Sequence, residues 1–391
     1  MEKVYLVEAL RTPFGSFGGC LADVPATKLA SLVIEKLLEK TGLSGEAVDQ
    51  VIAGQVITSC CKQGPARQAM RGAGIPDTTG ALTVNKLCGS GLKAIMLGAD
   101  AIRLGDSDVV IAGGMENMSQ APYGLPYGRY GMGLGDGKVL DLLMHDGLSD
   151  PDTGRAMGVL AQDRADAHGF SREAQDEFAV TSYKRAQRAI ESGLFDAEIV
   201  PVVKSTRKGD VIIDKDEEPF RVNLDRLASL RPVFAKDGTI TAANASTIND
   251  GASFVLLVSE AALEKYGLKP KARLVSYSTN SLHPDMFPDA PVGAIESAIK
   301  KAGLKLEDIG RFEINEAFAA VTMIALKDLG ITPEKVNVNG GAVSIGHPIG
   351  ASGGRLIATL IPELERSGER YGLATLCIGG GEAVAAGIEK I

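Results

Sequence analysis

Residues 87–94 read Leu-Cys-Gly-Ser-Gly-Leu-Lys-Ala, and they join an extended run at 82–85 to an amphipathic helix pattern. The apolar residues of that pattern fall on one helical face, which comprises Leu92, Ile95, Met96, Ala99 and Ile102. Cys88 is therefore expected near a helix N-terminus, where unpaired N–H groups and the helix dipole favour a thiolate over a thiol. The neighbouring glycines permit a tight turn and the close approach of a substrate. On position alone, Cys88 fits an inert core cysteine as well as a nucleophile.

Three later segments supply candidate partners for Cys88. They read Asn315-Glu316-Ala317-Phe318, Gly346-His347-Pro348 and Cys377-Ile378-Gly379-Gly380-Gly381. Each segment lies in a glycine-rich or strand-end turn, the kind of position from which side chains reach a shared site. Two cysteines, one histidine and one asparagine in such turns are typical of acyl transfer through a thiol.

These motifs resemble those of the thiolase family, and the likeness runs almost end to end. Seven blocks occur in the family's order: 65–68 (PARQ), 88–91 (CGSG), 113–116 (GGME), 244–246 (NAS), 315–318 (NEAF), 346–348 (GHP) and 377–381 (CIGGG). One block alone would be weak support for the resemblance, whereas seven in order are strong support.

Composition describes an ordinary folded protein. The 391 residues are 45% hydrophobic and 23% charged, with a net charge of −8, which argues against a dedicated nucleic-acid or anionic-membrane binder. A local basic patch for a phosphorylated ligand stays compatible with that charge. The five cysteines fit no zinc spacing, and the chain enters a strand at 4–7 with no targeting segment or membrane-spanning run. We therefore expect a cytoplasmic, reducing location.

The pattern of elements divides the chain into two similar halves and an insert. Strands are predicted at 4–7, 51–56, 82–85, 109–112, 254–259, 272–277, 312–314, 336–338 and 373–378, and helices at 27–39, 150–168, 171–192, 292–301, 316–329 and 353–364. A charged hairpin is predicted at 200–203 and 211–213. The expected domains are 1–117 plus 244–270, an inserted loop domain at 118–243, and 271–391.

An internal repeat supports that division. Gly89-Ser90-Gly91, a helix, and a strand ending at Gly113-Gly114 parallel Ala351-Ser352-Gly353, a helix, and a strand ending at Gly379-Gly380. The resemblance implies an α/β fold with two pseudo-symmetric halves stacked in five layers, α-β-α-β-α. It further implies that the insert covers the substrate and helps to assemble a homotetramer, a dimer of dimers, through the Gly- and Tyr-rich stretch 123–138.

The resemblance also implies a role for each candidate catalytic residue. Cys88 is the nucleophile that becomes acetylated, His347 takes its proton, and Cys377 is the second base. The N–H groups of Gly379 and Cys88 form one oxyanion hole, and His347 with Asn315, through a water, forms the other, tuned by Glu316. Simpler interpretations remain for three of them. His347 fits a structural turn histidine, Cys377 a buried strand-end cysteine, and Asn315 the N-cap of a helix beginning at Glu316.

The substrate contacts follow the family less closely. Positions matching the pantetheine tunnel and substrate contacts are Leu148, Met157, Ser246, Ala317 and Phe318, and Arg221 matches a basic residue near the adenine and phosphates. Two departures stand out, because Ala156 replaces a common histidine and Gly64 a common asparagine. Ala156 favours a wider acyl range, whereas the loop 146–150 resembles the short-chain, biosynthetic type.

The expected reaction is the reversible condensation of two acetyl-CoA to acetoacetyl-CoA and CoA through acetyl-Cys88. CoA thioesters are the substrates, and no metal or other cofactor is expected. The enzymatic alternatives are a broader 3-ketoacyl-CoA thiolase of β-oxidation and a ketoacyl synthase, whose usual Cys-His-His set disagrees with Cys377 and Asn315. A non-catalytic carrier or scaffold is the remaining alternative, and a downstream synthase that receives the product is compatible with an active enzyme.

Overall fold

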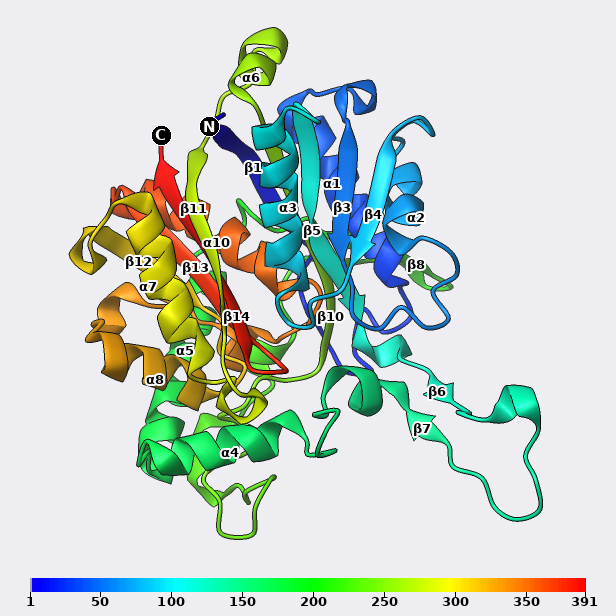
Figure 1. Cartoon of the computed structure of the whole chain (residues 1–391), viewed down its shortest axis with the longest axis vertical. Coiled ribbons are helices and arrows are strands. Elements are labelled where there is room, and N and C mark those ends of the chain that lie inside the picture. The colour runs from blue at the N-terminus through cyan, green and yellow to red at the C-terminus, as the bar shows by residue number, and fades with distance from the viewer. Residues whose placement is uncertain (1) are drawn as a thin grey trace.

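The structure is a computed structural model that describes residues 2–391. Both ends of the chain lie at the same end of the molecule in Figure 1, and a long loop between β6 and β7 extends from the opposite end. Within residues 2–391, no helix is long and apolar enough to cross a membrane.

The first half alternates strands and helices as the sequence predicts. Its elements are β1 (Val4–Arg11), β2 (Gly15–Ser16), α1 (Ala26–Thr41), β3 (Gln50–Gly54), α2 (Pro65–Gly72), β4 (Gly80–Val84), α3 (Ser90–Leu104), β5 (Val109–Asn117), β10 (Asn249–Val258) and α6 (Glu260–Tyr266). Strand β10, which follows the insert, pairs antiparallel with both β1 and β5. The chain therefore returns to the first sheet after the insert, as predicted.

The second half repeats this arrangement. Its elements are β11 (Ala272–Ser281), α7 (Ala290–Ala302), β12 (Ile309–Ile314), α8 (Ala319–Leu329), α9 (Ala342–Ile345), α10 (Ser352–Ser367), β13 (Tyr371–Ile378) and β14 (Glu382–Lys390). The strands of both halves follow the order β12-β13-β14-β11-β1-β10-β5-β3-β4, so β1 and β11 join the two half-sheets.

Helices α3 and α10 lie between the half-sheets. Their apolar residues, among them Ile95 and Leu360, share one buried cluster with strands of both halves. Helices α1 and α2 cover the outer face of the first half-sheet, and α7 and α8 cover the outer face of the second. The predicted five-layer order α-β-α-β-α is thereby confirmed.

Two glycines let the middle helices touch at their N-termini. A Cβ at Gly353 would lie 2.1 Å from the Leu92 nitrogen, and a Cβ at Gly91 would lie 2.9 Å from the Gly350 oxygen. Only glycine permits this backbone contact. The contact brings the turn before α3, which carries Cys88, against the turn before α10, which carries His347.

The insert contributes the elements β6 (Tyr123–Gly124), β7 (Leu140–Asp141), α4 (Met157–Ala167), α5 (Arg172–Glu191), β8 (Val202–Thr206) and β9 (Gly209–Ile213). Ser171 caps α5 by accepting a hydrogen bond from the Ala174 nitrogen, and β8 and β9 form the predicted hairpin. The loop between β6 and β7 has no regular element beyond one short turn, and its tyrosines are exposed, Tyr127 at 75% and Tyr130 at 89%.

Two predicted elements are wrong, one in the insert and one in the second half of the chain. The helix predicted at 150–168 begins only at Met157, because Asp150 Oδ1 accepts hydrogen bonds from the Thr153 nitrogen and hydroxyl, and Gly154 has φ +68°. This local side-chain turn competes with the helix. The strand predicted at 336–338 is only an isolated bridge between Val336 and Phe312, since Asn337 adopts φ +46°.

Candidate active site

A mostly apolar cavity of about 230 Å³ lies where the turns of both halves meet the insert. Nine of the predicted site residues line it, namely Cys88, His347, Cys377, Gly379, Leu148, Met157, Ser246, Ala317 and Phe318. Two predicted residues are not in its wall. Asn315 lies beside His347, and Arg221 lies in a separate hollow.

The turn that presents Cys88 holds a strained residue. Leu87 has φ +47°, a conformation that a branched side chain rarely adopts. The first residue of α3 holds the turn in place, because Ser90 Oγ donates to the Leu87 carbonyl at 2.7 Å and accepts from the Lys86 nitrogen at 2.8 Å. Asn85 Oδ1 accepts from the Leu87 nitrogen at 2.9 Å. These bonds fix the backbone on which Cys88 sits.

Burial decides the protonation of Cys88. The N–H groups of Gly379 and of Cys88 itself lower its pKa, but burial raises it more, to about 11. The predicted lowering of the pKa by N–H groups at the helix N-terminus is present, but burial outweighs it. At neutral pH Cys88 is a thiol, so it needs a base to become a nucleophile.

His347 is prepared to act as that base. Burial, followed by the charge of Arg355, lowers its pKa to about 3, so the imidazole is neutral. Ser352 Oγ donates its single hydrogen to the Pro348 carbonyl at 3.0 Å and lies 2.5 Å from His347 Nδ1. Assigning that hydroxyl hydrogen to Pro348 makes His347 Nδ1 the donor to Ser352 Oγ and leaves Nε2 unprotonated, 3.4 Å from Asn315 Nδ2.

The backbone of His347 is held from the other half of the molecule. Asn249 Oδ1, on β10, accepts from the His347 nitrogen at 2.9 Å. Gly346 has φ +107°, and a Cβ there would lie 2.4 Å from the Asn249 side chain. The imidazole is therefore oriented by residues of both halves.

Asn315 lies against the ring of His347. Its Nδ2 is 3.4 Å from both ring nitrogens, and its buried Oδ1 has no hydrogen-bond partner among the described residues. The interpretation of Asn315 as the N-cap of a helix beginning at Glu316 is wrong, because α8 begins at Ala319 and Phe318 is its N-cap. Residues 315–318 form an irregular turn in which the Ala317 carbonyl accepts from the Ser246 nitrogen at 3.0 Å.

Cys377 is the second-last residue of β13 and is 1% exposed. Burial raises its pKa well above the ordinary value, and the nearby Cys88 raises it further. Cys377 packs in a cluster with Phe287 and Phe318. The rings of these two phenylalanines meet edge to face, with their centroids 6.3 Å apart. A second thiol thus lies in the same apolar cavity as Cys88.

Arg221 belongs to a hollow of about 680 Å³ beside the cavity. Arg226 and Arg231 line the same hollow, and Thr247 lies in the walls of both spaces. Arg221 pairs with Glu217 at 3.0 Å, whereas Arg226 and Arg231 have no carboxylate within 4.0 Å in residues 2–391. Sequence reasoning missed these two arginines, although their spacing of five residues within a charged, irregular stretch was a usable signal.

Sequence reasoning also missed Glu116 and the aromatic wall. Glu116 is buried and accepts from the nitrogens of Val56, Ile57 and Gly350 at 2.9–3.1 Å, so it ties β5 to the loop after His347. Burial raises its pKa to about 7. Phe234 and Phe287 line the cavity, and Ala156, which the sequence predicts to favour a wider acyl range, lies in the same wall. The block 113–116 includes Glu116 but gives it no role, and no residue pattern marks the two phenylalanines, because their contacts depend on tertiary packing.

No group of three or more His, Cys, Asp or Glu in the described part of the chain could hold a metal ion.

Comparison with known proteins identifies the family. Residues 4–261 match the thiolase N-terminal domain and residues 268–390 match the thiolase C-terminal domain, so the chain belongs to the thiolase family.

Similar proteins carry related names. An acetyl-CoA acetyltransferase of Chromobacterium violaceum is 48% identical over 99% of this chain and 100% of its own length. A probable acetyl-CoA acyltransferase of Staphylococcus aureus is 46% identical over the full length of both proteins. The crystal structure of the Bacillus anthracis acetyl-CoA acetyltransferase superposes with a TM-score of 0.97 at 42% identity, covering 100% of this chain and 99% of that one.

Proposed function

We propose that this protein is an acetyl-CoA acetyltransferase that reversibly condenses two acetyl-CoA to acetoacetyl-CoA and CoA. The observation that carries the proposal is the convergence of Cys88, His347, Cys377 and the Gly379 N–H on one apolar cavity. The names of full-length relatives support the same substrate. Thiol–thioester exchange and carbon–carbon bond formation of this kind need only acid–base and nucleophilic groups, so no metal or other cofactor is invoked.

In the first step, His347 Nε2 takes the proton of Cys88 and the sulfur attacks the carbonyl of acetyl-CoA. The Gly379 and Cys88 N–H groups stabilise the oxyanion. The carbon–sulfur bond to CoA then breaks, and His347 returns the proton to the CoA sulfur. The products are acetyl-Cys88 and CoA.

In the second step, neutral His347 takes the thiol proton of Cys377, because burial keeps Cys377 protonated until a base acts on it. The Cys377 sulfur then removes a proton from the α-carbon of a second acetyl-CoA. The resulting enolate attacks acetyl-Cys88, releasing acetoacetyl-CoA and the Cys88 thiolate, which recovers a proton from protonated His347. His347 and a water held by Asn315 stabilise the enolate oxygen.

The hollow beside the cavity suits the nucleotide end of CoA. Arg221, Arg226 and Arg231 offer positive charge to phosphates, and Thr247 links the hollow to the cavity. The pantetheine chain would then pass Leu148, Met157 and Ser246 on its way to Cys88.

Acyl chain length is tested by comparing CoA-dependent cleavage of acetoacetyl-, 3-ketohexanoyl- and 3-ketodecanoyl-CoA. A steep preference for acetoacetyl-CoA is expected. The second candidate is a broader 3-ketoacyl-CoA thiolase, favoured by the small Ala156 in the cavity wall, and a flat or rising profile would establish it. Absence of cleavage for all three substrates would overturn both.

We also propose that the protein assembles as a homotetramer in a reducing compartment such as the cytoplasm. The support is the exposed apolar loop between β6 and β7, with Tyr127, Tyr130 and Leu134 on its surface, because monomers rarely expose such patches. The need to keep Cys88 and Cys377 as thiols supports the compartment. Light scattering at micromolar concentration should give a tetramer, and a monomer would contradict the assembly.

A further inference from the structure

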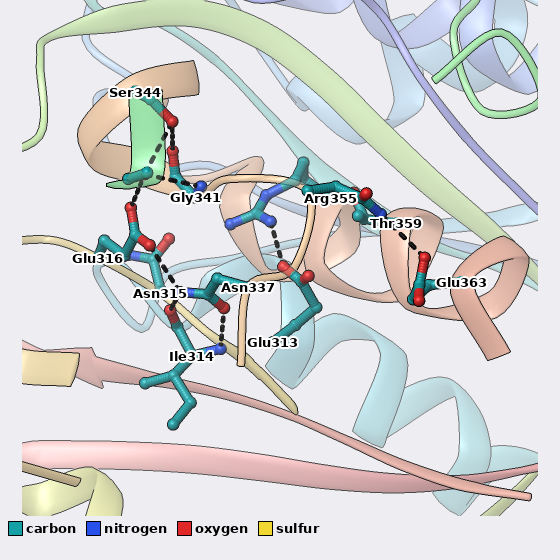
Figure 2. Close-up of polar contacts among 12 residues, drawn as sticks. Glu313, Ile314, Asn315, Glu316, Asn337, Gly341, Ser344, Arg355, Thr359 and Glu363 are labelled. Atoms are coloured by element: carbon teal, nitrogen blue, oxygen red, sulfur yellow. Dashed lines mark hydrogen bonds and ion pairs between the residues drawn. The ribbon is translucent and has the colours of Figure 1, made fainter. Parts of the chain in front are cut away.

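Glu316, a buried carboxylate in the NEAF turn that the resemblance expects to tune the second oxyanion hole, takes no direct part in the proposed proton transfers. Glu316 is 1% exposed, and its Oε2 accepts from Ser182 Oγ at 2.7 Å and from the Val343 nitrogen at 3.1 Å. Its Oε1 accepts from Asn337 Nδ2 at 2.8 Å. Figure 2 shows Glu316 between Asn337 on one side and the Gly341–Ser344 turn on the other. Every partner is a donor, so the carboxylate must supply only acceptors.

Ser182 extends this cluster into the insert. It lies on α5, is 3% exposed, and gives its hydroxyl hydrogen to Glu316. Its oxygen accepts from the Gly341 nitrogen at 3.1 Å and lies 2.8 Å from Ser344 Oγ, which itself donates to the Gly341 carbonyl at 3.0 Å. Ser182 therefore contacts the N-cap of the short helix α9 and a residue within that helix.

Close packing leaves these groups little freedom. A Cβ at Gly341 would lie 2.3 Å from the Glu316 carboxylate carbon, and a Cβ at Gly340 would lie 2.7 Å from the Ala186 Cβ on α5. Helix α5 and the Glu316 carboxylate are thus pressed against the backbone that leads into α9. Shifting either one would move that backbone.

The cluster links three segments that carry functional groups. Glu316 directly follows Asn315, and α9 leads through Gly346 into His347. Ser182 directly precedes Tyr183, which lines the arginine hollow. Neither Ser182 nor Glu316 contacts His347, so each can act on it only through the backbone of the turn.

We propose that Ser182 and Glu316 are positioning residues, which hold the His347 turn in register with Asn315 and make helix α5 part of the active-site scaffold. The proposal rests on the proposed function, because the rates that it concerns are those of acyl transfer at Cys88. Small displacements of a reacting group, of about 1 Å, can lower a rate by about 100-fold.

The test compares Ser182→Ala and Glu316→Gln with Ser278→Ala in the full-length protein. Ser278 is a matched control, since it is a buried serine on β11 whose Oγ donates to the Ala294 carbonyl at 2.6 Å, away from the cavity. The readouts are kcat and KM for thiolysis of acetoacetyl-CoA, the rate of Cys88 alkylation by iodoacetamide, and Tm.

Ser182→Ala should lower kcat by about 10-fold and Glu316→Gln by about 100-fold, with KM within about 2-fold of the original. Glu316→Gln should have the larger effect because the NH₂ group of the glutamine would face one of the hydrogen-bond donors that bind the Glu316 carboxylate. Alkylation of Cys88 should slow in parallel, since it also needs His347 in place. Ser278→Ala should lower Tm as much as Ser182→Ala while keeping the original kcat.

A Ser182→Ala protein with a lowered Tm but unchanged kcat and alkylation rate would overturn the proposal. So would a change in KM with kcat unchanged, because that would place the effect in substrate binding. If the unmodified protein cleaves no acetoacetyl-CoA, the proposed function fails instead, and the alkylation rates still decide the role of Ser182. If Glu316→Gln fails to fold, Ser182→Ala alone carries the test.

Discussion

Helices α3 and α10 both begin with a buried serine, yet the two serines form hydrogen bonds to different kinds of group. Ser90 binds only the backbone of its own turn, to the Leu87 carbonyl and the Lys86 nitrogen. Ser352 reaches a side chain, His347 Nδ1, as well as the Pro348 carbonyl. The same position in the two halves thus holds the backbone behind a nucleophile in one case and orients a base in the other.

The largest expected effect comes from removing the chemical group that the α3 turn presents. Cys88→Ala should abolish acyl-enzyme formation and lower turnover by at least about 10⁴-fold, because the sulfur that carries the acetyl group is removed. Mass spectrometry after incubation with acetyl-CoA checks this directly. Normal turnover in the variant would refute the assignment of Cys88.

Cys377→Ser should separate the two chemical steps. Condensation and thiolysis should slow by about 10³-fold, since a serine hydroxyl is a far weaker acid than a thiol and cannot serve as the α-carbon base. Acetylation of Cys88 should persist in a single-turnover measurement. Loss of acetylation as well would mean that Cys377 supports the first step and has been misassigned.

The paired variants Ser352→Ala and Ser90→Ala test the comparison itself. Ser352→Ala should lower kcat by about 100-fold with little change in Tm, because His347 loses the acceptor that keeps Nε2 unprotonated. Ser90→Ala should mainly lower stability, by about 1–3 kcal/mol, since it leaves the strained Leu87 turn without its support. Equal effects of the two changes on both kcat and Tm would remove the distinction.

The smallest expected effect concerns the pH dependence of stability. Burial raises the pKa of Glu116 to about 7 in the folded protein from an ordinary value of 4.5. Below pH 4.5 both states hold the proton. Between pH 4.5 and 7 the unfolded chain loses it first, so a contribution of about 3 kcal/mol to the free energy of unfolding is lost as the pH rises.

Glu116→Gln should therefore make the fall in stability from pH 5 to 8 shallower, although the protein is less stable at pH 5. Chemical denaturation at several pH values measures that slope. Burial also raises the pKa of Glu313, against the lowering charge of Arg355 at 2.6 Å, so the slope that remains in Glu116→Gln includes a contribution from Glu313. An unchanged slope in Glu116→Gln would show that Glu116 keeps an ordinary pKa.

The contrast between the Cys88 turn and the His347 turn explains which parts of the site could be predicted from the sequence. The Cys88 turn is built from local bonds and nearby glycines, so its place between a strand and a helix was readable from residues 82–102. The His347 turn depends on Asn249, Ser182 and Glu316, which are up to 165 positions away or in the insert. No local pattern marks such bonds, and the importance of these residues emerges only from the fold.

The protonation of Cys88 and the course of the insert were predicted less well for related reasons. The helix N-terminus was visible in the sequence, but the apolar residues that bury the thiol come from several distant segments, such as Met118 and Ile349. The helix expected from residue 150 was delayed by the Asp150 side chain, a competition that apolar periodicity does not register.

The apolar cavity has a consequence for the reagents that can reach the nucleophile. Because Cys88 stays a thiol beside a neutral imidazole, an incoming anion gains no positive partner at the reacting end and must lose its hydration. An uncharged electrophile meets no such cost. Covalent inhibitors of this protein should therefore pair a neutral warhead with negative charge placed far enough away to lie in the arginine hollow.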